Sequence, residues 1–143
     1  MMQSPDLERL LATAAAAAAQ AYAPYSGFRV GAALLLHTGE IVTGANIENS
    51  SYGLTLCAER SALARAIAKH GPRIRVASVA IANLNRSASP PCGACRQVLA
   101  EFCSPDTPVA FPVISAITGD VETQICTFGE LFPYTFNLPA TSL

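Results

Sequence analysis

Three cysteines constrain this sequence more than any other feature. Cys57 begins a Cys-Ala-Glu-Arg segment (57–60), and Cys92 and Cys95 lie in a Pro-Cys-Gly-Ala-Cys segment (91–95). Three thiolates can hold a zinc ion, and a catalytic zinc site has three protein ligands, whereas a structural site has four. The two histidines of the chain lack the spacing of a fourth ligand. The sequence therefore predicts a hydrolytic zinc centre that joins two distant segments, with Glu59 beside it.

Hydrophobic periodicity and turn residues predict the secondary structure. We expect helices over residues 4–21, 56–69, 91–102 and 128–132, and strands over 28–36, 40–45, 74–82 and 109–117. A helix, a hairpin and then alternating helices and strands predict an α/β protein with a mixed sheet covered by helices on both faces. Pro112 cannot donate to a central ladder, so we expect an edge position or a bulge there.

Both cysteine segments are predicted to begin helices, and this placement has a physical use. The unpaired N–H groups and the positive end of a helix dipole favour thiolate over thiol. A zinc ion with three thiolates still carries a net charge of about −1, which weakens its ability to acidify water. We expect Arg60 to offset this charge by donating hydrogen bonds to thiolate sulfurs, with Arg96 as a weaker candidate.

Composition limits the classes of protein to consider. The 143 residues are expected to form a single domain over 1–143. Only 13% of the residues are charged, about half the usual share, which favours apolar surface hidden between subunits. A net charge of −1 without a basic stripe argues against nucleic acid as a partner. The five cysteines do not form a disulfide pattern, which indicates a reducing compartment.

The N-terminal segment invites a different interpretation, as a signal peptide. Residues 10–23 are rich in alanine, but the preceding residues carry Asp6 and Glu8 against a single Arg9. A signal peptide has a positive leader, so we favour a helix of strong helix formers with Ser4 as its N-cap. No stretch reaches the ~20 apolar residues of a membrane span. We therefore expect a cytoplasmic protein with no membrane partner.

Each of these features also has a plainer interpretation. A Cys-x-x-Cys pair also occurs in structural zinc sites and in redox pairs. Taken by itself, Glu59 is an acidic residue in the first turn of a helix, where it complements the helix dipole. Arg60 alone is a solvated charge. Cys103 and Cys126 are interpreted as core residues. Three cysteine ligands, a glutamate that is not a ligand and a Pro-Cys-x-x-Cys segment are together typical of nucleobase deaminases.

Taken together, the motifs resemble those of the cytidine deaminase family, in its small, homotetrameric, three-cysteine branch. The resemblance covers nearly the whole chain and rests on several motifs in the same order, which are Tyr-Ala-Pro-Tyr-Ser-Gly-Phe (22–28), Val-Gly-Ala-Ala-Leu (30–34), Gly-Ala-Asn-Ile-Glu-Asn (44–49), Ser-Tyr-Gly (51–53), Cys-Ala-Glu-Arg (57–60) and Pro-Cys-Gly-Ala-Cys-Arg-Gln-Val-Leu (91–99). It implies a three-layer α/β/α sandwich with a mixed five-stranded sheet. It also implies hydrolysis of free cytidine and deoxycytidine to uridine or deoxyuridine and ammonia, a step of pyrimidine salvage.

The resemblance also implies roles for individual residues. One Zn²⁺ per subunit would be held by Cys57, Cys92 and Cys95, and Glu59 would carry protons between water, the base and the leaving amine. The nucleoside would contact Phe28, Asn46, Glu48 and Ala58, with the Asn46 and Glu48 pair on the ribose hydroxyl. Tyr52 and Phe136 would reach the site of a neighbouring subunit.

Several alternatives remain open from the sequence. Arg29 and a long 109–117 segment depart from the family pattern, and the ending over 131–136 keeps its outline with a bulkier second position, Phe132. A related enzyme could act on a modified aminopyrimidine nucleoside, such as a nucleoside antibiotic. Editing of a base within RNA or DNA needs backbone contacts that the charge does not favour. A catalytically inactive binding module that is held together by a structural zinc ion would not need Glu59.

Overall fold

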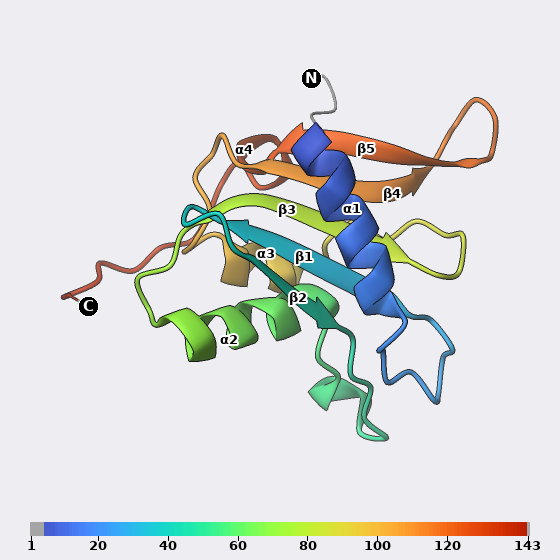
Figure 1. Ribbon diagram of the computed structural model, residues 1–143, viewed down its shortest axis with the longest axis horizontal. Coiled ribbons are helices and arrows are strands. Elements are labelled where there is room, and N and C mark those ends of the chain that lie inside the picture. Colours follow the sequence, from blue (N-terminus) through green and yellow to red (C-terminus); the bar gives the residue numbers. More distant parts are fainter. Residues whose placement is uncertain (1–4, 143) are drawn as a thin grey trace.

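A five-stranded sheet forms the middle layer of the molecule, with helices on both faces (Figure 1). The computed structural model describes residues 5–142, so the expected N-cap Ser4 lies outside the described residues. The elements in chain order are α1 (Pro5–Ala18), β1 (Val30–Leu36), β2 (Ile41–Ala45), η1 (Tyr52–Leu54), α2 (Ala58–His70), β3 (Val76–Asn83), α3 (Gly93–Leu99), β4 (Pro108–Ile114), β5 (Val121–Thr127) and α4 (Phe128–Leu131).

The sheet is mixed, as the sequence and the resemblance predict. Its strand order is β2-β1-β3-β4-β5. The β3–β4 pair is parallel, and β1 pairs with both β2 and β3 in the antiparallel sense. The helix α3 lies in the connection between the parallel strands β3 and β4, which parallel pairing requires because a tight hairpin cannot join such strands. The predicted three-layer α/β/α sandwich is confirmed.

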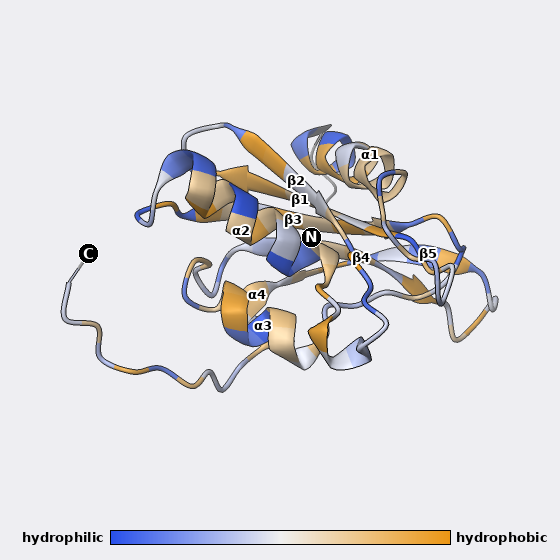
Figure 2. Ribbon diagram, turned by 90° about the horizontal axis from the view of Figure 1, so that it is seen from below, coloured by the Kyte–Doolittle hydropathy of each residue, from blue (hydrophilic) through white to orange (hydrophobic). Residues whose placement is uncertain are grey.

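The alternating side chains of β1 supply two separate cores, and Figure 2 shows the sheet between α1 on one face and α2 and α3 on the other. Leu34 and Leu36 point to the face that α2 covers, whereas Ala33 points to the face that α1 covers. This division follows from the two-residue period of a strand. Leu10 of α1 is 1% exposed, and full burial of such a side chain stabilises a fold by about 1.5–3 kcal/mol. Both cores meet at the sheet and hold the two helix layers in place.

The predicted element boundaries need small corrections. The helix expected over 91–102 ends at Leu99, because the chain then turns and the Phe102 carbonyl accepts the Val76 N–H at 3.0 Å. The strand expected from residue 28 begins at Val30, and β5 has no counterpart in the sequence prediction. Residues 121–124 of β5 are exposed, so their sequence lacks the apolar alternation that marks a half-buried strand.

The expectation that Pro112 lies on an edge strand or in a bulge is wrong. It lies inside β4, which has β3 on one side and β5 on the other, and it pairs in regular register with Thr123. Its carbonyl faces away from β5 and accepts the Ser89 N–H at 3.0 Å. In a strand the N–H and C=O of one residue point to the same side, so the missing donor of Pro112 falls where β5 needs none.

Residues 10–18 of the alanine-rich segment belong to α1, whose apolar side packs on β1 and β3, so the helix expected over 4–21 ends at Ala18. Over the described residues, none of the helices has the length and apolar character that a crossing of the membrane requires. The residues that follow α4 run as an extended tail away from the sheet (Figure 1).

Candidate metal centre and active site

The three predicted ligand cysteines come together at the ends of two helices. Cys57 is the N-cap of α2 and Cys92 is the N-cap of α3, while Cys95 lies in the first turn of α3. Their sulfur atoms all lie within 4.8 Å of one another, and those of Cys57 and Cys92 are 3.9 Å apart. A tetrahedral zinc ion with bonds of about 2.3 Å places its sulfur ligands about 3.8 Å apart. The sulfur cluster therefore fits zinc.

The electrostatics of the cluster also call for a cation. Hydrogen bonds from the Cys95 thiol and from Arg60 lower the pKa of Cys57 to about 5. The same contact with Cys57 raises the pKa of Cys95, and burial acts in the same direction. The first thiolate is thus easily formed, whereas a second thiolate beside it is opposed by like charge. Three thiolates become compatible only when a metal ion binds among them.

Arg60 contacts the cluster as the sequence predicts. Its Nη2 atom donates to the Cys57 sulfur at 3.3 Å, and this hydrogen bond raises the pKa of the Arg60 guanidinium. Arg96, the weaker candidate, instead donates to the carbonyls of Pro91 and Leu131, both at 2.8 Å. The reason is its place on α3, from which the guanidinium spans the loop before Cys92 and the end of α4. Arg96 is therefore bound to backbone rather than to thiolates.

Glu59 lies in the first turn of α2 and is 5% exposed. Burial raises the pKa of its carboxyl, and the Cys57 thiolate adds to this effect. A carboxyl group with a raised pKa can hold and release a proton nearer to neutral pH than a solvated one. Glu59 thus has the environment of a general acid and base.

A cavity of about 310 Å³ opens beside Glu59. Its wall includes Phe28, Asn46 and Ala58, which are three of the four side chains predicted to bind substrate. The cysteines Cys57 and Cys92 also line it, so the metal cluster borders the cavity. The sequence reasoning missed five further lining residues, which are Val30, Thr55, Ala88, Ser89 and Pro90. The last three directly precede the Pro-Cys-Gly-Ala-Cys segment, and this continuity is the signal that could have found them.

The structure does not bring the other predicted site residues into this cavity. Both oxygens of the Glu48 carboxylate are engaged by the turn that precedes Phe28: Oε2 accepts the Tyr25 and Ser26 N–H groups at 2.9 and 3.2 Å, and Oε1 accepts the Ser26 hydroxyl. Tyr52 is 67% exposed and meets the edge of Tyr25. Phe136 is 66% exposed on the C-terminal tail, where its carbonyl accepts Gln97 Nε2 at 3.0 Å.

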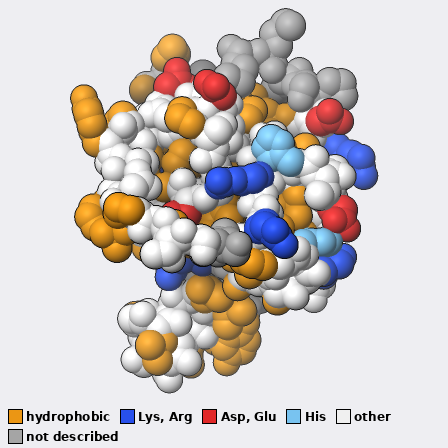
Figure 3. Space-filling model, turned by 90° about the vertical axis from the view of Figure 1, so that its left-hand side faces the viewer, with side chains coloured by type: hydrophobic (Ala, Val, Ile, Leu, Met, Phe, Trp, Pro, Cys, Tyr) orange, Lys and Arg blue, Asp and Glu red, His pale blue; other side chains and the backbone are white. Residues whose placement is uncertain are grey.

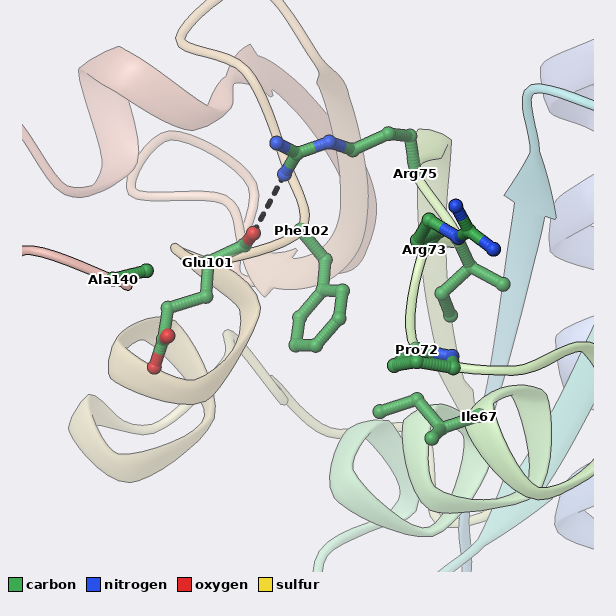
Figure 4. A pocket seen from close by; sticks show the side chains of 8 residues that line it. Ile67, Pro72, Arg73, Arg75, Glu101, Phe102 and Ala140 are labelled. Carbon is green, nitrogen blue, oxygen red and sulfur yellow. Dashed lines mark hydrogen bonds between the residues drawn. The ribbon is translucent and has the colours of Figure 1, made fainter. Parts of the chain in front are cut away.

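A second cavity, of about 360 Å³, lies near the opposite end of α2 (Figure 4). Ile67, Pro72 and Phe102 form its apolar wall, and Arg75 crosses above Phe102 to donate to the Glu101 carbonyl at 2.7 Å. None of the cysteines lines this cavity. The acid, the sulfur cluster and the predicted binding residues all converge on the first cavity.

The fold and the site define a class of protein, an α/β/α sandwich with a three-cysteine metal centre at paired helix N-termini. Residues 4–111 match the family model described as the cytidine and deoxycytidylate deaminase zinc-binding region. The chain therefore belongs to the cytidine and deoxycytidylate deaminase family. Because the family model is a zinc-binding region and the sulfur cluster fits zinc, zinc is the cofactor of this centre.

Curated relatives and solved structures agree with this assignment. The chain is 49% identical to a cytidine deaminase of Halalkalibacterium halodurans, over 92% of this chain and 94% of that protein. It is 46% identical to a cytidine deaminase of Sporosarcina psychrophila, over 92% of each. The crystal structure of the cytidine deaminase from Mycobacterium tuberculosis superposes with a TM-score of 0.77 at 38% identity, and covers 94% of this chain and 100% of that chain.

Proposed function

We propose that this protein hydrolyses free cytidine and deoxycytidine to uridine or deoxyuridine and ammonia, and that it serves pyrimidine salvage. The observation that carries the proposal is the buried Glu59 carboxyl at a cavity bordered by Cys57 and Cys92 of the sulfur cluster. An acid beside a metal centre, within a cavity of small-molecule size, is the arrangement that hydrolysis of a C–N bond requires.

In this proposal zinc is held by Cys57, Cys92 and Cys95. A zinc ion in such a site supplies Lewis acidity and lowers the pKa of a water molecule. Glu59 would accept the first proton that water loses and deliver it to N3 of the pyrimidine. After the hydroxyl group has added at C4, Glu59 would take the proton of that hydroxyl and pass it to the amine, which leaves as ammonia. A carboxyl group that alternates between base and acid contributes about 10²–10⁴-fold in rate.

Asn46 and Glu48 retain hydrogen-bonding capacity for the sugar. The Asn46 amide uses one N–H on the Phe28 carbonyl, at 2.8 Å, and one lone pair on the Val30 N–H, at 2.9 Å. An amide has two N–H donors and two acceptor lone pairs, so one of each is free for a ribose hydroxyl. Oε1 of Glu48 accepts only the Ser26 hydroxyl among the described groups and can accept a second donor. Ala58 lines the cavity beside Glu59 and would contact the base.

We propose that residues 1–143 act as a single catalytic domain and assemble as a homotetramer. The support is a set of exposed large apolar side chains between residues 25 and 54 and on the tail, which include Tyr25, Ile47, Tyr52, Leu54, Tyr134 and Phe136. Burial of such a surface favours association, and it would place Tyr52 and Phe136 against neighbouring subunits. Light scattering that gives a monomeric mass at working concentration would contradict the assembly.

The proposed substrate is a free nucleoside rather than a polynucleotide. On the face shown in Figure 3, Lys and Arg side chains lie among acidic, histidine and apolar side chains. A binder of nucleic acid presents a continuous basic surface to the phosphates. Cysteines that must stay reduced to bind zinc support a cytoplasmic location. The five cysteines of the chain are all free.

Ammonia release from a panel of nucleosides, with and without a chelator, tests the proposed function. We expect release from cytidine and deoxycytidine, and loss of release after zinc is removed. The panel also includes modified aminopyrimidine nucleosides, because Arg29 and the cavity wall at 88–90 bear on substrate breadth. Absence of ammonia and of any absorbance change with cytidine would overturn the proposal. Ammonia release from a modified nucleoside alone would show that this nucleoside, and not cytidine, is the substrate.

A further inference from the structure

The three residues before β1, 27–29, are hydrogen-bonded by asparagine side chains on both edges of the chain. The strands β2 and β3 that flank β1 end at Ala45 and Asn83, so neither reaches far enough to pair with residues 27–29. Peptide groups left without partners in this position would weaken the segment that carries Phe28 into the cavity. Two side-chain amides, those of Asn46 and Asn85, supply the missing hydrogen bonds instead.

Asn46 bonds the edge that faces β2. Its side chain accepts the Val30 N–H at 2.9 Å and donates to the Phe28 carbonyl at 2.8 Å. Its backbone N–H donates to the Val30 carbonyl at 3.1 Å. The three bonds continue the β1–β2 ladder beyond the end of β2, with one asparagine in place of a strand.

Asn85 bonds the opposite edge in the same pattern. Its Oδ1 accepts the Arg29 N–H at 2.9 Å, and its Nδ2 donates to the Gly27 carbonyl at 3.0 Å. The neighbouring Leu84 N–H donates to the Arg29 carbonyl at 3.1 Å. The two peptide groups that Asn85 joins therefore flank Phe28 on either side.

The loop that carries Asn85 also forms part of the cavity wall, at residues 88–90. Asn83 fixes this loop, because its Oδ1 accepts the Asn85 N–H at 3.0 Å and its Nδ2 donates to the Ser89 hydroxyl at 2.9 Å. The Ser89 N–H is bonded to Pro112 in β4. Residues 88–90 line the same cavity as Phe28 and lead directly to Cys92. The side-chain amide of Asn85 thus joins the segment that carries Phe28 to the loop that leads to Cys92.

We propose that Asn85 is a positioning residue for nucleoside binding, which sets the place of the Phe28 ring relative to the 88–90 wall. This inference rests on the proposed function, because it assigns the cavity to a nucleoside. A ring held in place before binding costs less conformational entropy when the base packs against it. Asn85 itself does not line the cavity, so it acts through Phe28.

The main variant is Asn85→Ala, which removes both hydrogen bonds at an exposed position. Loss of one or two hydrogen bonds from the Phe28 segment should raise KM for cytidine, and Kd for the product uridine, by about three- to tenfold. We expect kcat to stay within about twofold, because packing of the ring on the base is similar in the ground and transition states. Asn85→Asp keeps the acceptor for Arg29 but places a carboxylate against the Gly27 carbonyl, and should act in the same direction.

The matched control is Arg86→Asn, which removes a long side chain from the same loop. Arg86 has a φ of 51°, a backbone conformation that asparagine tolerates, and this variant leaves both bonds of Asn85 intact. We expect its uridine Kd to equal that of the wild type. Zinc content and Tm of all variants show that each is folded and loaded.

A double-mutant cycle with Phe28→Leu separates positioning from a general structural role. If Asn85 acts through the ring, Asn85→Ala should have little further effect on uridine Kd in the Phe28→Leu background. An equal loss in both backgrounds, or unchanged KM and Kd for Asn85→Ala in an active enzyme, would overturn the inference. A wild-type protein that releases no ammonia from cytidine would instead refute the proposed function, so the two failures are distinct.

Discussion

The Arg60 guanidinium lies 3.3 Å from the Cys57 sulfur. Cys57 precedes Arg60 by three residues, and both lie at the N-terminal end of α2. This spacing lets the side chain fold back over the first helical turn toward the N-cap. The contact supplies positive charge to the sulfur cluster from the chain itself. Three thiolates and one zinc ion together carry a net negative charge, and the Arg60 guanidinium offsets it.

Replacement of Arg60 should weaken the metal centre. Arg60→Ala removes a hydrogen bond to a thiolate, and loss of such an outer contact costs about 10–100-fold in metal affinity or activity. We expect faster zinc loss to a chelator and a lower kcat, with Arg60→Lys intermediate because an ammonium carries the charge without the planar fork. Zinc content after timed dialysis is the measurement.

Arg65→Ala is the control for this prediction. Arg65 lies on the same helix but donates to the Thr43 carbonyl and hydroxyl, at 3.3 and 3.2 Å, rather than to sulfur. Its removal should leave zinc retention unchanged. Equal zinc loss in the two variants would show that Arg60 acts only as a general helix charge.

Glu59→Gln should separate metal binding from proton transfer. The amide has nearly the same shape as the carboxyl group and can remain buried, but it cannot accept and return a proton. We expect full zinc content and a fall in turnover of at least about 10²-fold, the lower range for general acid and base catalysis. Measured zinc stoichiometry and ammonia release decide the matter, and substantial turnover in Glu59→Gln would assign the proton transfer to another group.

Much of the fold follows from local sequence, and the exceptions have physical causes. Hydrophobic periodicity and turn residues predict the two helices that carry the cysteines, because those signals lie within the helices or a few residues from their ends. The strand β5 was missed because it is an edge strand whose first residues are exposed. Its pairing with β4 is set by the hairpin at 115–120 and not by its own hydrophobic pattern.

The site residues also fall into those that the local sequence predicts and those that depend on tertiary contacts. Cys57, Glu59 and Arg60 form a local pattern whose chemistry can be predicted from spacing. Asn85 could not be found in this manner, because its partner Gly27 is distant in the chain, and an asparagine in a loop is usually a turn residue. Glu48 was predicted to face a sugar, yet its carboxylate also organises the turn before Phe28. Its second role depends on tertiary contacts that no local pattern contains.

The carboxylate of Glu48 should make the stability of the fold sensitive to acid. A hydrogen bond from the Ser26 hydroxyl, with those of two N–H groups, lowers the pKa of Glu48 below its ordinary value of 4.5. A group with a lowered pKa in the folded state stabilises the protein above its unfolded pKa, and this contribution is lost as the pH falls through the folded pKa. Glu48→Gln should therefore lower Tm at pH 7, and this loss should shrink as the pH falls below 4.5. Glu122→Gln, at an exposed position of β5, is the control and should leave Tm unchanged at pH 7. A Tm difference for Glu48→Gln that stays constant across this pH range would contradict the assignment.

The close approach of α2 to β2 should depend on Gly44. A methyl group added there would lie 2.7 Å from the Ala58 carbonyl oxygen and closer still to the Ala62 backbone nitrogen. Backbone atoms of a packed helix cannot move aside as a flexible side chain can, so Gly44→Ala must push α2 away from the sheet. Overpacking of this kind costs about 1–3 kcal/mol, and it would also shift Cys57 and Glu59, which lie at the same end of α2. We expect a lower Tm together with a lower zinc content.

Gly53→Ala is the matched control, because nothing lies within 4 Å of the added methyl group, and it should leave both quantities unchanged. A wild-type Tm for Gly44→Ala would show that α2 can shift without cost, and that its packing on Gly44 does not fix the metal centre.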